Sequence, residues 1–149
     1  MNRRSFQVLS IVCALIGLVA LADRAAAAAV RPYSAHGTAQ FVSPTDFIGS
    51  GQATHLGRYS EAGSVAFAPT PNPAVLQVDG SIVYTAASGD ELHAVVSGTL
   101  NGLTGVIAAT VVYAGGTGRF ADASGSSSLA GQLLPGGAIS VAVSGTIDY

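Results

Sequence analysis

A period-two alternation of apolar and polar residues runs through most of the chain beyond residue 30, and it restricts the fold more than any other feature. In residues 33–41, small apolar and aromatic side chains alternate with serine, histidine, threonine and glutamine. The same alternation recurs clearly in residues 75–86, 91–99 and 138–149, whereas apolar residues at helical spacing do not recur beyond the N-terminus. This alternation is typical of half-buried β-strands, and it predicts an all-β protein.

Clusters of turn-forming residues divide the alternation into eight candidate strands. The second and third strands are predicted at residues 50–59 and 61–68, on either side of Ser60. Short strands separated by regular turn signals indicate a sandwich or a barrel. Closure into a barrel removes exposed strand edges and leaves an interior that is either filled or holds one small ligand. We therefore predict a single eight-stranded antiparallel β-barrel.

A glycine-dense corner interrupts the strand pattern after residue 113. Gly115, Gly116 and Gly118 lie close together and are followed directly by Arg119 and Phe120. Glycine reaches positive φ without the steric cost of a β-carbon, so this spacing predicts a sharp bend. We expect the bend to place the ring of Phe120 in the core, with a carboxylate from Asp90 or Asp122 beside Arg119.

A phosphate-binding loop is the alternative interpretation of this corner, because residues 116–121 fit the pattern G-x-G-x-x-A after a strand. A dinucleotide site also requires a long helix next and an acidic residue about 20 positions further on. The serine-rich residues 123–128 are poor helix formers, and no acid follows Asp122 before Asp148. These departures favour the structural interpretation.

Three segments carry a resemblance to a known barrel superfamily. The strongest is G-G-T-G-R-F-x-x-A-x-G at residues 115–125, and the weaker two are GQATHLGR at residues 51–58 and ASGDE at residues 87–91. The first resembles a segment of dirigent proteins and allene oxide cyclases, and all three resemble small secreted bacterial proteins of the same superfamily. The resemblance implies an eight-stranded antiparallel barrel with a central cavity. The catalytic acids of the plant enzymes have no residue-by-residue match here, so it implies the fold and not the activity.

The N-terminus predicts export. A basic head at residues 2–4 precedes an apolar run at residues 8–22 and a small-residue segment at residues 25–29. This is the three-part plan of a cleavable signal peptide, and the apolar run is short for a membrane span. We expect a signal peptide at residues 1–29 and a single barrel domain at residues 30–149, secreted or periplasmic. Residues 3–6 also fit the R-R-x-F pattern of the twin-arginine route, and the choice of export route stays open.

The charge and cysteine content of the expected mature chain excludes several classes of partner. Residues 30–149 contain three arginines, seven acidic residues and no lysine, a net charge of −4. Such a surface repels nucleic acid and anionic lipid. No cysteine remains to form a disulfide or act as a nucleophile.

No cofactor or metal site is predicted. His36, His55 and His93 are widely spaced in the sequence. Arg58 is interpreted as an ion-pair partner of Glu61, or as a contact for an acidic ligand at the barrel mouth.

Five residues are candidates for a cavity inside the barrel. Tyr33, Tyr84 and Tyr113 lie on the apolar faces of their strands, and His55 and Tyr59 join them if the glycine-alanine face of the second strand points inward. Phenols and an imidazole in an apolar cavity can orient a small ligand or move a proton. In the alternative interpretation, the phenols form hydrogen bonds at the barrel rim, and His55 is a packing residue whose ring nitrogens have hydrogen-bond partners.

Three functions follow from this pattern. The first is an exported barrel that binds a small apolar or phenolic molecule, or serves as a structural or interaction module. The second is a cyclase or isomerase, as the resemblance implies. The third is a small outer-membrane barrel, because the terminal Tyr149 follows an alternating strand. The small number of aromatic residues and the absence of tryptophan argue against the aromatic girdles of such barrels.

Overall fold

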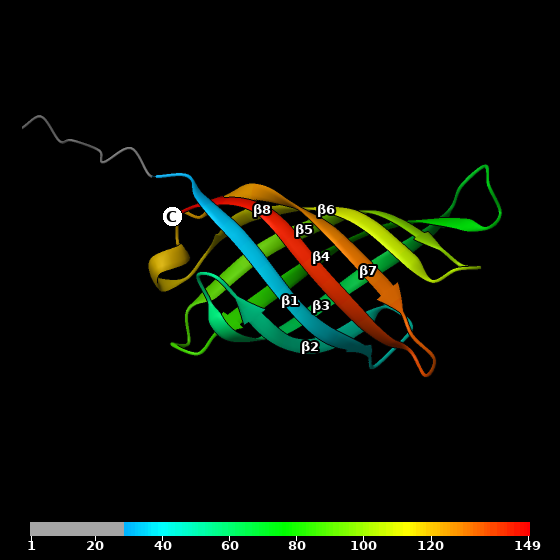
Figure 1. The fold of residues 1–149 in the computed structure, drawn as a ribbon, viewed down its shortest axis with the longest axis horizontal. Coiled ribbons are helices and arrows are strands. Elements are labelled where there is room, and N and C mark those ends of the chain that lie inside the picture. Colours follow the sequence, from blue (N-terminus) through cyan, green and yellow to red (C-terminus); the bar gives the residue numbers. More distant parts are fainter. Residues whose placement is uncertain (1–28) are drawn as a thin grey trace, which may run out of the picture.

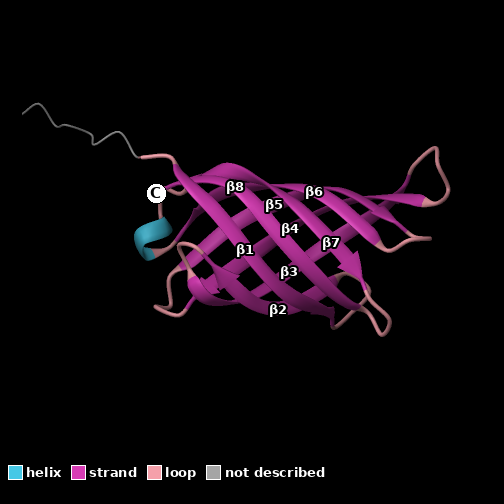
Figure 2. Cartoon of the chain, in the orientation of Figure 1, coloured by secondary structure: helices cyan, strands magenta, loops and turns pink. Residues whose placement is uncertain are grey.

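A computed structural model of the chain describes residues 29–149 as one closed β-barrel (Figures 1 and 2). It is all-β apart from one short 3₁₀ helix, η1 (Gly118–Phe120). The expected signal peptide lies almost entirely outside the described residues. Among residues 29–149, no helix is long and apolar enough to cross a membrane. The strands are β1 (Arg31–Phe41), β2 (Asp46–Ala53), β3 (Gly57–Pro69), β4 (Val75–Ala86), β5 (Glu91–Asn101), β6 (Val106–Gly116), β7 (Ser124–Leu133) and β8 (Ala138–Asp148).

Each strand pairs antiparallel with the next along the chain, and the last returns to pair with the first. The β1–β8 ladder that closes the barrel runs from Arg31 opposite Ile147 to Gln40 opposite Ala138. No edge is therefore left within the sheet. The predicted eight-stranded antiparallel barrel is confirmed.

The alternating residues point inward and outward as the sequence predicts. The barrel interior holds the buried aromatic and branched side chains. Serine, threonine, alanine and glutamine form most of the outer surface of the strands, which we call the wall. Interior glycines allow strands to approach closely. A β-carbon at Gly98, for example, would clash with the backbone of Ala109 on the adjacent strand.

One end of the barrel is closed by the glycine-dense corner. Phe120 is fully buried, and its ring centroid lies 5.0 Å from that of Tyr149 at the C-terminus. Gly115 and Gly118 adopt φ of 78° and 55°, conformations in which a β-carbon is strained. Leu56 is also buried at this end. The prediction that the bend places Phe120 in the core is confirmed.

The predicted bounds of the second and third strands, residues 50–59 and 61–68, are wrong. The second strand ends at Ala53, residues 54–56 form a turn, and β3 begins at Gly57. Gly57 has a φ of 68°, which suits the turn. The several glycines in this region hide the apolar face, so the alternation alone did not show where the chain reverses direction. Consequently Tyr59 lies on β3, and His55 lies in the turn between the two strands.

Candidate functional site

The half of the barrel away from η1 contains an apolar cavity of about 90 Å³. It reaches the open end, where Phe41, Phe47 and Phe67 form an aromatic collar. The ring centroid of Phe41 lies 6.1 Å from that of Phe47 and 6.2 Å from that of Phe67. Other apolar side chains line the sides of the cavity: Val65, Val78, Ile82, Val96, Leu100, Ile107, Leu129, Leu133, Ile139, Val141 and Val143.

A single carboxyl group, that of Glu61, lies in this cavity. Glu61 is 7 % exposed and is the one buried acidic residue in the described part of the chain. It is opposite Tyr84 on β4 and Gly49 on β2. A β-carbon at Gly49 would lie 2.5 Å from the Glu61 carboxylate oxygen Oε1, so the glycine provides the room for this side chain.

No residue in the range 29–149 forms an ion pair or a side-chain hydrogen bond with Glu61. Burial in these apolar surroundings raises the pKa of Glu61 from its ordinary 4.5 to about 7. An unpaired buried carboxylate is costly, and the group avoids this cost by holding its proton. Near neutral pH, Glu61 therefore exists in both forms and can donate or accept a hydrogen bond.

Two phenols line the cavity beside Glu61. The rings of Tyr59 and Tyr84 meet edge to face, with centroids 5.4 Å apart. The Tyr59 hydroxyl lies over Gly37 and Gly51, where β-carbons would lie 2.8 and 2.6 Å from it. Burial, and then the neighbouring Glu61, raises the pKa of both phenols. Both remain protonated, so they are hydrogen-bond donors at any physiological pH.

Tyr33 and Tyr113 are buried inside the barrel but do not line the cavity. Their ring centroids are 5.1 Å apart, and the hydroxyls of Tyr113 and Ser127 form a hydrogen bond of 2.8 Å. Burial raises the pKa of Tyr113 to about 12, an effect that the bond to Ser127 opposes. Burial also raises the pKa of Tyr33, whose hydroxyl lies near Tyr113 without meeting hydrogen-bond geometry to any described group. These two residues fill the closed half of the interior.

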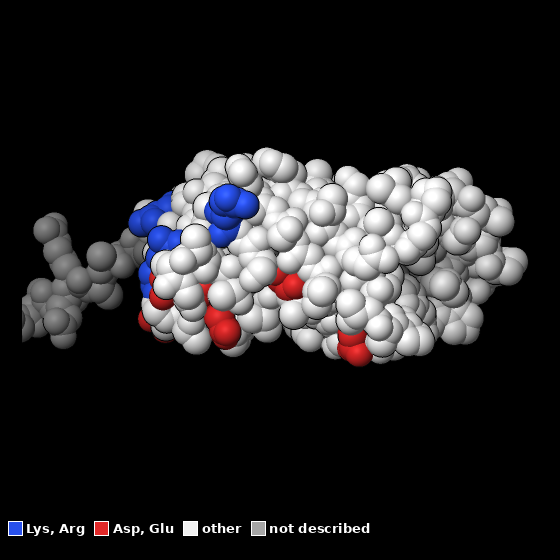
Figure 3. Space-filling view, turned by 90° about the horizontal axis from the view of Figure 1, so that it is seen from below, with Lys and Arg blue, Asp and Glu red and all other residues white. Residues whose placement is uncertain are grey.

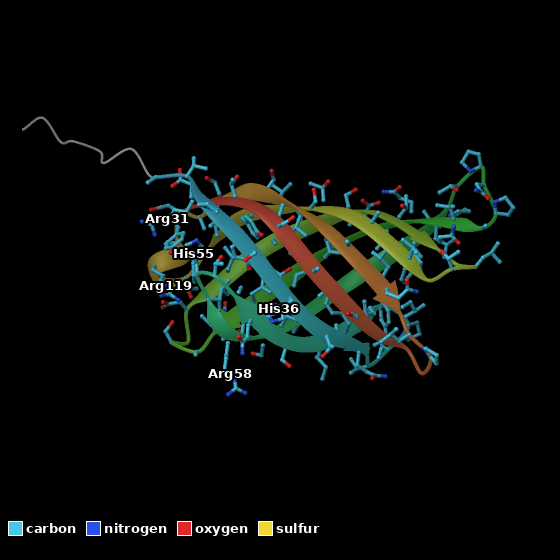
Figure 4. The ribbon with its side chains drawn as sticks, in the orientation of Figure 1. Arg31, His36, His55, Arg58 and Arg119 are labelled. Carbon is cyan, nitrogen blue, oxygen red and sulfur yellow. The ribbon has the colours of Figure 1, made fainter. Side chains whose placement is uncertain are left out.

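His55 lies outside the cavity, at the closed end. Its Nε2 is 2.9 Å from the Pro32 carbonyl oxygen, and its ring packs edge to face on Tyr149. Figure 4 shows His55 near Arg31 and Arg119, and His36 midway along the barrel. The structure therefore brings two of the five candidate residues, Tyr59 and Tyr84, into the cavity.

The predicted ion pair between Arg58 and Glu61 is wrong. Residues 58 and 61 face opposite sides of β3: Arg58 is exposed (Figure 4), whereas Glu61 is inside the barrel. Sequence reasoning missed Glu61 because it divided β3 at Ser60. Continuous alternation from Tyr59 through Val65 to Phe67 places Glu61 on the inner face, and this was the available signal.

The glycine-dense corner offers no place for a phosphate. The Asp90 carboxylate lies directly against Gly118, and its Oδ2 is 3.6 Å from Nε of Arg119. Nη2 of Arg119 donates a hydrogen bond of 2.9 Å to the His55 carbonyl oxygen. Asp90, rather than Asp122, is the ion-pair partner of Arg119 in the described structure. A carboxylate at this position repels an anion, which supports the structural interpretation.

Within residues 29–149, no three metal-ligating side chains come together. In comparisons with known proteins, no protein-family model and no curated protein matches this chain. The site is therefore defined by its own geometry: an apolar cavity with an aromatic collar, and a buried carboxyl with two phenols at its base.

Proposed function

We propose that the protein is an exported barrel that binds a slender apolar molecule carrying a neutral oxygen group. The observation that carries this proposal is the Glu61 carboxyl, buried without a partner from residues 29–149 inside an apolar cavity that reaches one end of the barrel. Buried polar groups are normally hydrogen-bonded. A ligand oxygen would give Glu61 the partner that residues 29–149 do not supply.

The cavity volume selects the shape of the ligand. About 90 Å³ is less than the roughly 150 Å³ of an engineered cavity that accepts benzene. Fused rings are too large, whereas the end of an alkyl chain enters and its remainder passes the collar of Phe41, Phe47 and Phe67. A single-ring phenol requires these rings to move apart.

The base of the cavity selects the head group. Protonated Glu61 donates a hydrogen bond, and the phenols of Tyr59 and Tyr84 donate two more. An alcohol, ketone or ester oxygen accepts them without bringing a charge into the apolar interior. A carboxylate is disfavoured when Glu61 is ionised, since two like charges in low dielectric repel strongly. We therefore propose neutral alkyl alcohols and carbonyl compounds as the ligand class.

The test is a binding titration of residues 29–149 with decanol and with decanoate, followed by native mass spectrometry. The expected result is saturable binding of decanol, and binding of decanoate that weakens as pH rises through about 7, the pKa of Glu61. Glu61→Gln keeps the shape of the side chain but removes its ionisation, so the pH dependence of decanoate binding is expected to disappear. If neither decanol nor decanoate binds saturably at any pH, the proposal is refuted.

Glu91→Gln is the matched control. Glu91 lies on β5 with its side chain 40 % exposed, and its Oε2 is 3.1 Å from Nε2 of His93. Removal of this exposed charge is expected to leave both titrations unchanged. If Glu91→Gln and Glu61→Gln alter binding equally, the cavity carboxyl is not the cause.

Catalysis of a cyclisation or isomerisation is the second candidate function. A carboxyl with a pKa of about 7 in a cavity is suited to move a proton between substrate atoms. The resemblance to allene oxide cyclases and dirigent proteins supports it as an analogy at the level of fold. The mostly filled interior argues against it, because a substrate that must fold needs more than about 90 Å³. Conversion of a bound probe, rather than its release unchanged, would favour catalysis.

The distribution of polar residues argues against the outer-membrane alternative. The walls carry serine, threonine and glutamine, and the interior is apolar. Outer-membrane barrels have the reverse arrangement, with an apolar band facing lipid and a polar interior. We propose a secreted or periplasmic location, for which the expected signal peptide and the Ser/Thr-rich wall are the supporting observations.

A further inference from the structure

Seven of the ten charged residues of the described chain lie at or near one end of the barrel. All three arginines of the described chain (Arg31, Arg58 and Arg119) lie at or near the end closed by η1 (Figures 3 and 4). Four acids are also there, in the β4–β5 turn, beside η1 and at the end of β8: Asp90, Glu91, Asp122 and Asp148. The molecule is therefore strongly asymmetric along the barrel axis.

The open end has the opposite character. Its four connecting loops, residues 42–45, 70–74, 102–105 and 134–137, contain no charged residue. Large apolar side chains are exposed around the same rim: Leu103 is 84 % exposed, Val42 60 %, Leu134 41 % and Phe67 38 %. Asp46 lies at the base of these loops and accepts a hydrogen bond of 2.8 Å from Ser43, and Asp79 is exposed on the outer face of β4.

Hydrogen bonds fix the backbone of the two loops that carry Leu103 and Leu134. The backbone N–H groups of Leu103 and Thr104 donate to Oδ1 of Asn101 at 3.0 and 3.1 Å. Gln132 donates to the Thr104 carbonyl oxygen at 2.8 Å, which ties this loop to β7. The Leu134 N–H donates to the Ala138 carbonyl oxygen at 2.7 Å. Both loops present their leucines to solvent.

We propose that this rim, formed by Val42, Phe67, Leu103 and Leu134, docks the open end of the barrel onto an uncharged lipid surface. Exposed leucine and phenylalanine beside a polar wall are suited to enter the boundary between head groups and acyl chains. The net negative charge of residues 29–149 disfavours anionic lipid, and the uncharged loops do not need it. The seven charged residues at the other end keep that end in water.

Docking in this orientation places the cavity mouth against the hydrocarbon. Phe41 and Leu133, which line the cavity, are directly followed by the rim residues Val42 and Leu134. An apolar molecule would then pass between lipid and cavity without crossing water. This route rests on the proposed ligand-binding function, whereas the docking itself does not.

The test is flotation of residues 29–149 with phosphatidylcholine vesicles. This part of the chain closes its own sheet and buries its own core, and it lacks the apolar run of residues 8–22, which would bind lipid by itself. The protein is expected to float with the vesicles, independently of salt. The double substitution Leu103→Asp with Leu134→Asp is expected to weaken partitioning at least tenfold, because it removes two large apolar groups from the contact.

Val95→Asp with Ser144→Asp is the matched control, since both residues are exposed on the walls of β5 and β8 and the added charge is the same. It is expected to float like the unmodified protein. The proposal is overturned if the unmodified protein stays in the aqueous phase, if it floats only with anionic vesicles at low salt, or if the wall variant loses as much binding as the rim variant.

A second measurement avoids added charge. Residues 29–149 contain no cysteine, so Leu103→Cys and Val95→Cys can each carry one polarity-sensitive dye. A blue shift on vesicle addition is expected at position 103 and not at position 95, and equal spectra would overturn the proposal. Decanol binding in vesicle-free solution reports separately on the cavity: its failure refutes the proposed ligand and leaves the vesicle results to decide docking.

Discussion

Substitution of Glu61 by glutamine is expected to remove from the barrel a loss of stability that develops between about pH 5 and pH 8. In the folded protein the pKa of Glu61 is about 7, and its ordinary value is 4.5. Between these two values the native state holds a proton that the unfolded state has lost. Stability therefore falls as pH rises through this window, because the native state binds more protons than the unfolded state.

The size of the effect follows from the two pKa values. A difference of one pKa unit corresponds to about 1.4 kcal/mol, so the raised pKa of Glu61 costs about 3 kcal/mol at a pH above both values. Because Glu61 is 7 % exposed, solvent screening reduces this cost little. Part of the cost is already present at about pH 5, so Glu61 is expected to lower the unfolding free energy of the wild-type protein by about 2–3 kcal/mol between about pH 5 and pH 8.

Urea unfolding of the wild type and of Glu61→Gln across this pH range measures the difference directly. Since only the difference between the two proteins is used, the titration of all other groups cancels. Asp79→Asn, which removes an exposed carboxylate that is in no ion pair of the described residues, is expected to retain the wild-type pH dependence. If the curves of unfolding free energy against pH are parallel for the wild type and Glu61→Gln, the pKa of Glu61 is not raised in the folded protein. The reasoning from burial would then be refuted.

Three further predictions concern the packing that closes the barrel and shapes the cavity. Phe120→Ala is expected to cost about 3–5 kcal/mol in urea unfolding, because a fully buried ring is removed; a cost below ~1 kcal/mol would contradict its role in closing the end. Gly51→Ala places a β-carbon 2.6 Å from the Tyr59 hydroxyl and against neighbouring backbone, so thermal unfolding should show a loss of about 1–3 kcal/mol. Tyr113→Phe should cost about 1–2 kcal/mol through the lost 2.8 Å bond to Ser127. The double variant with Ser127→Ala should show a coupling energy in a double-mutant cycle, and strict additivity would exclude the bond.

Much of the fold was predictable because a strand has a side-chain period of two. Tyr33, Tyr84, Ile139 and Phe120 were assigned to the interior from alternation and turn chemistry alone, and all four are buried. The signals are local: each depends on neighbouring residues along one strand or at one bend. Barrel closure was also inferred from the sequence, since eight charge-poor strands are best protected when no edge remains.

The candidate site was only partly predictable, because its residues come together through the register between strands. Around His55 the glycines carry no side chain to mark a face, so the turn at residues 54–56 was not visible in the pattern. Glu61 is an exception to the rule that charged residues face water. The residues opposite it lie on other strands, Gly49 on β2 and Tyr84 on β4. Its pKa depends on burial, a property of the closed barrel that no local segment possesses.

The sequence by itself determined that this protein is built from alternating β-strands with a sharp aromatic-bearing bend, because those features depend on residues close together in the chain. The tertiary structure decided which polar side chains were enclosed, where the cavity opened, and that most of the charged residues lie at one end and exposed leucines at the other. These outcomes depend on the register between neighbouring strands and on the β1–β8 pairing that closes the barrel, because only the closed barrel has an interior and two different ends.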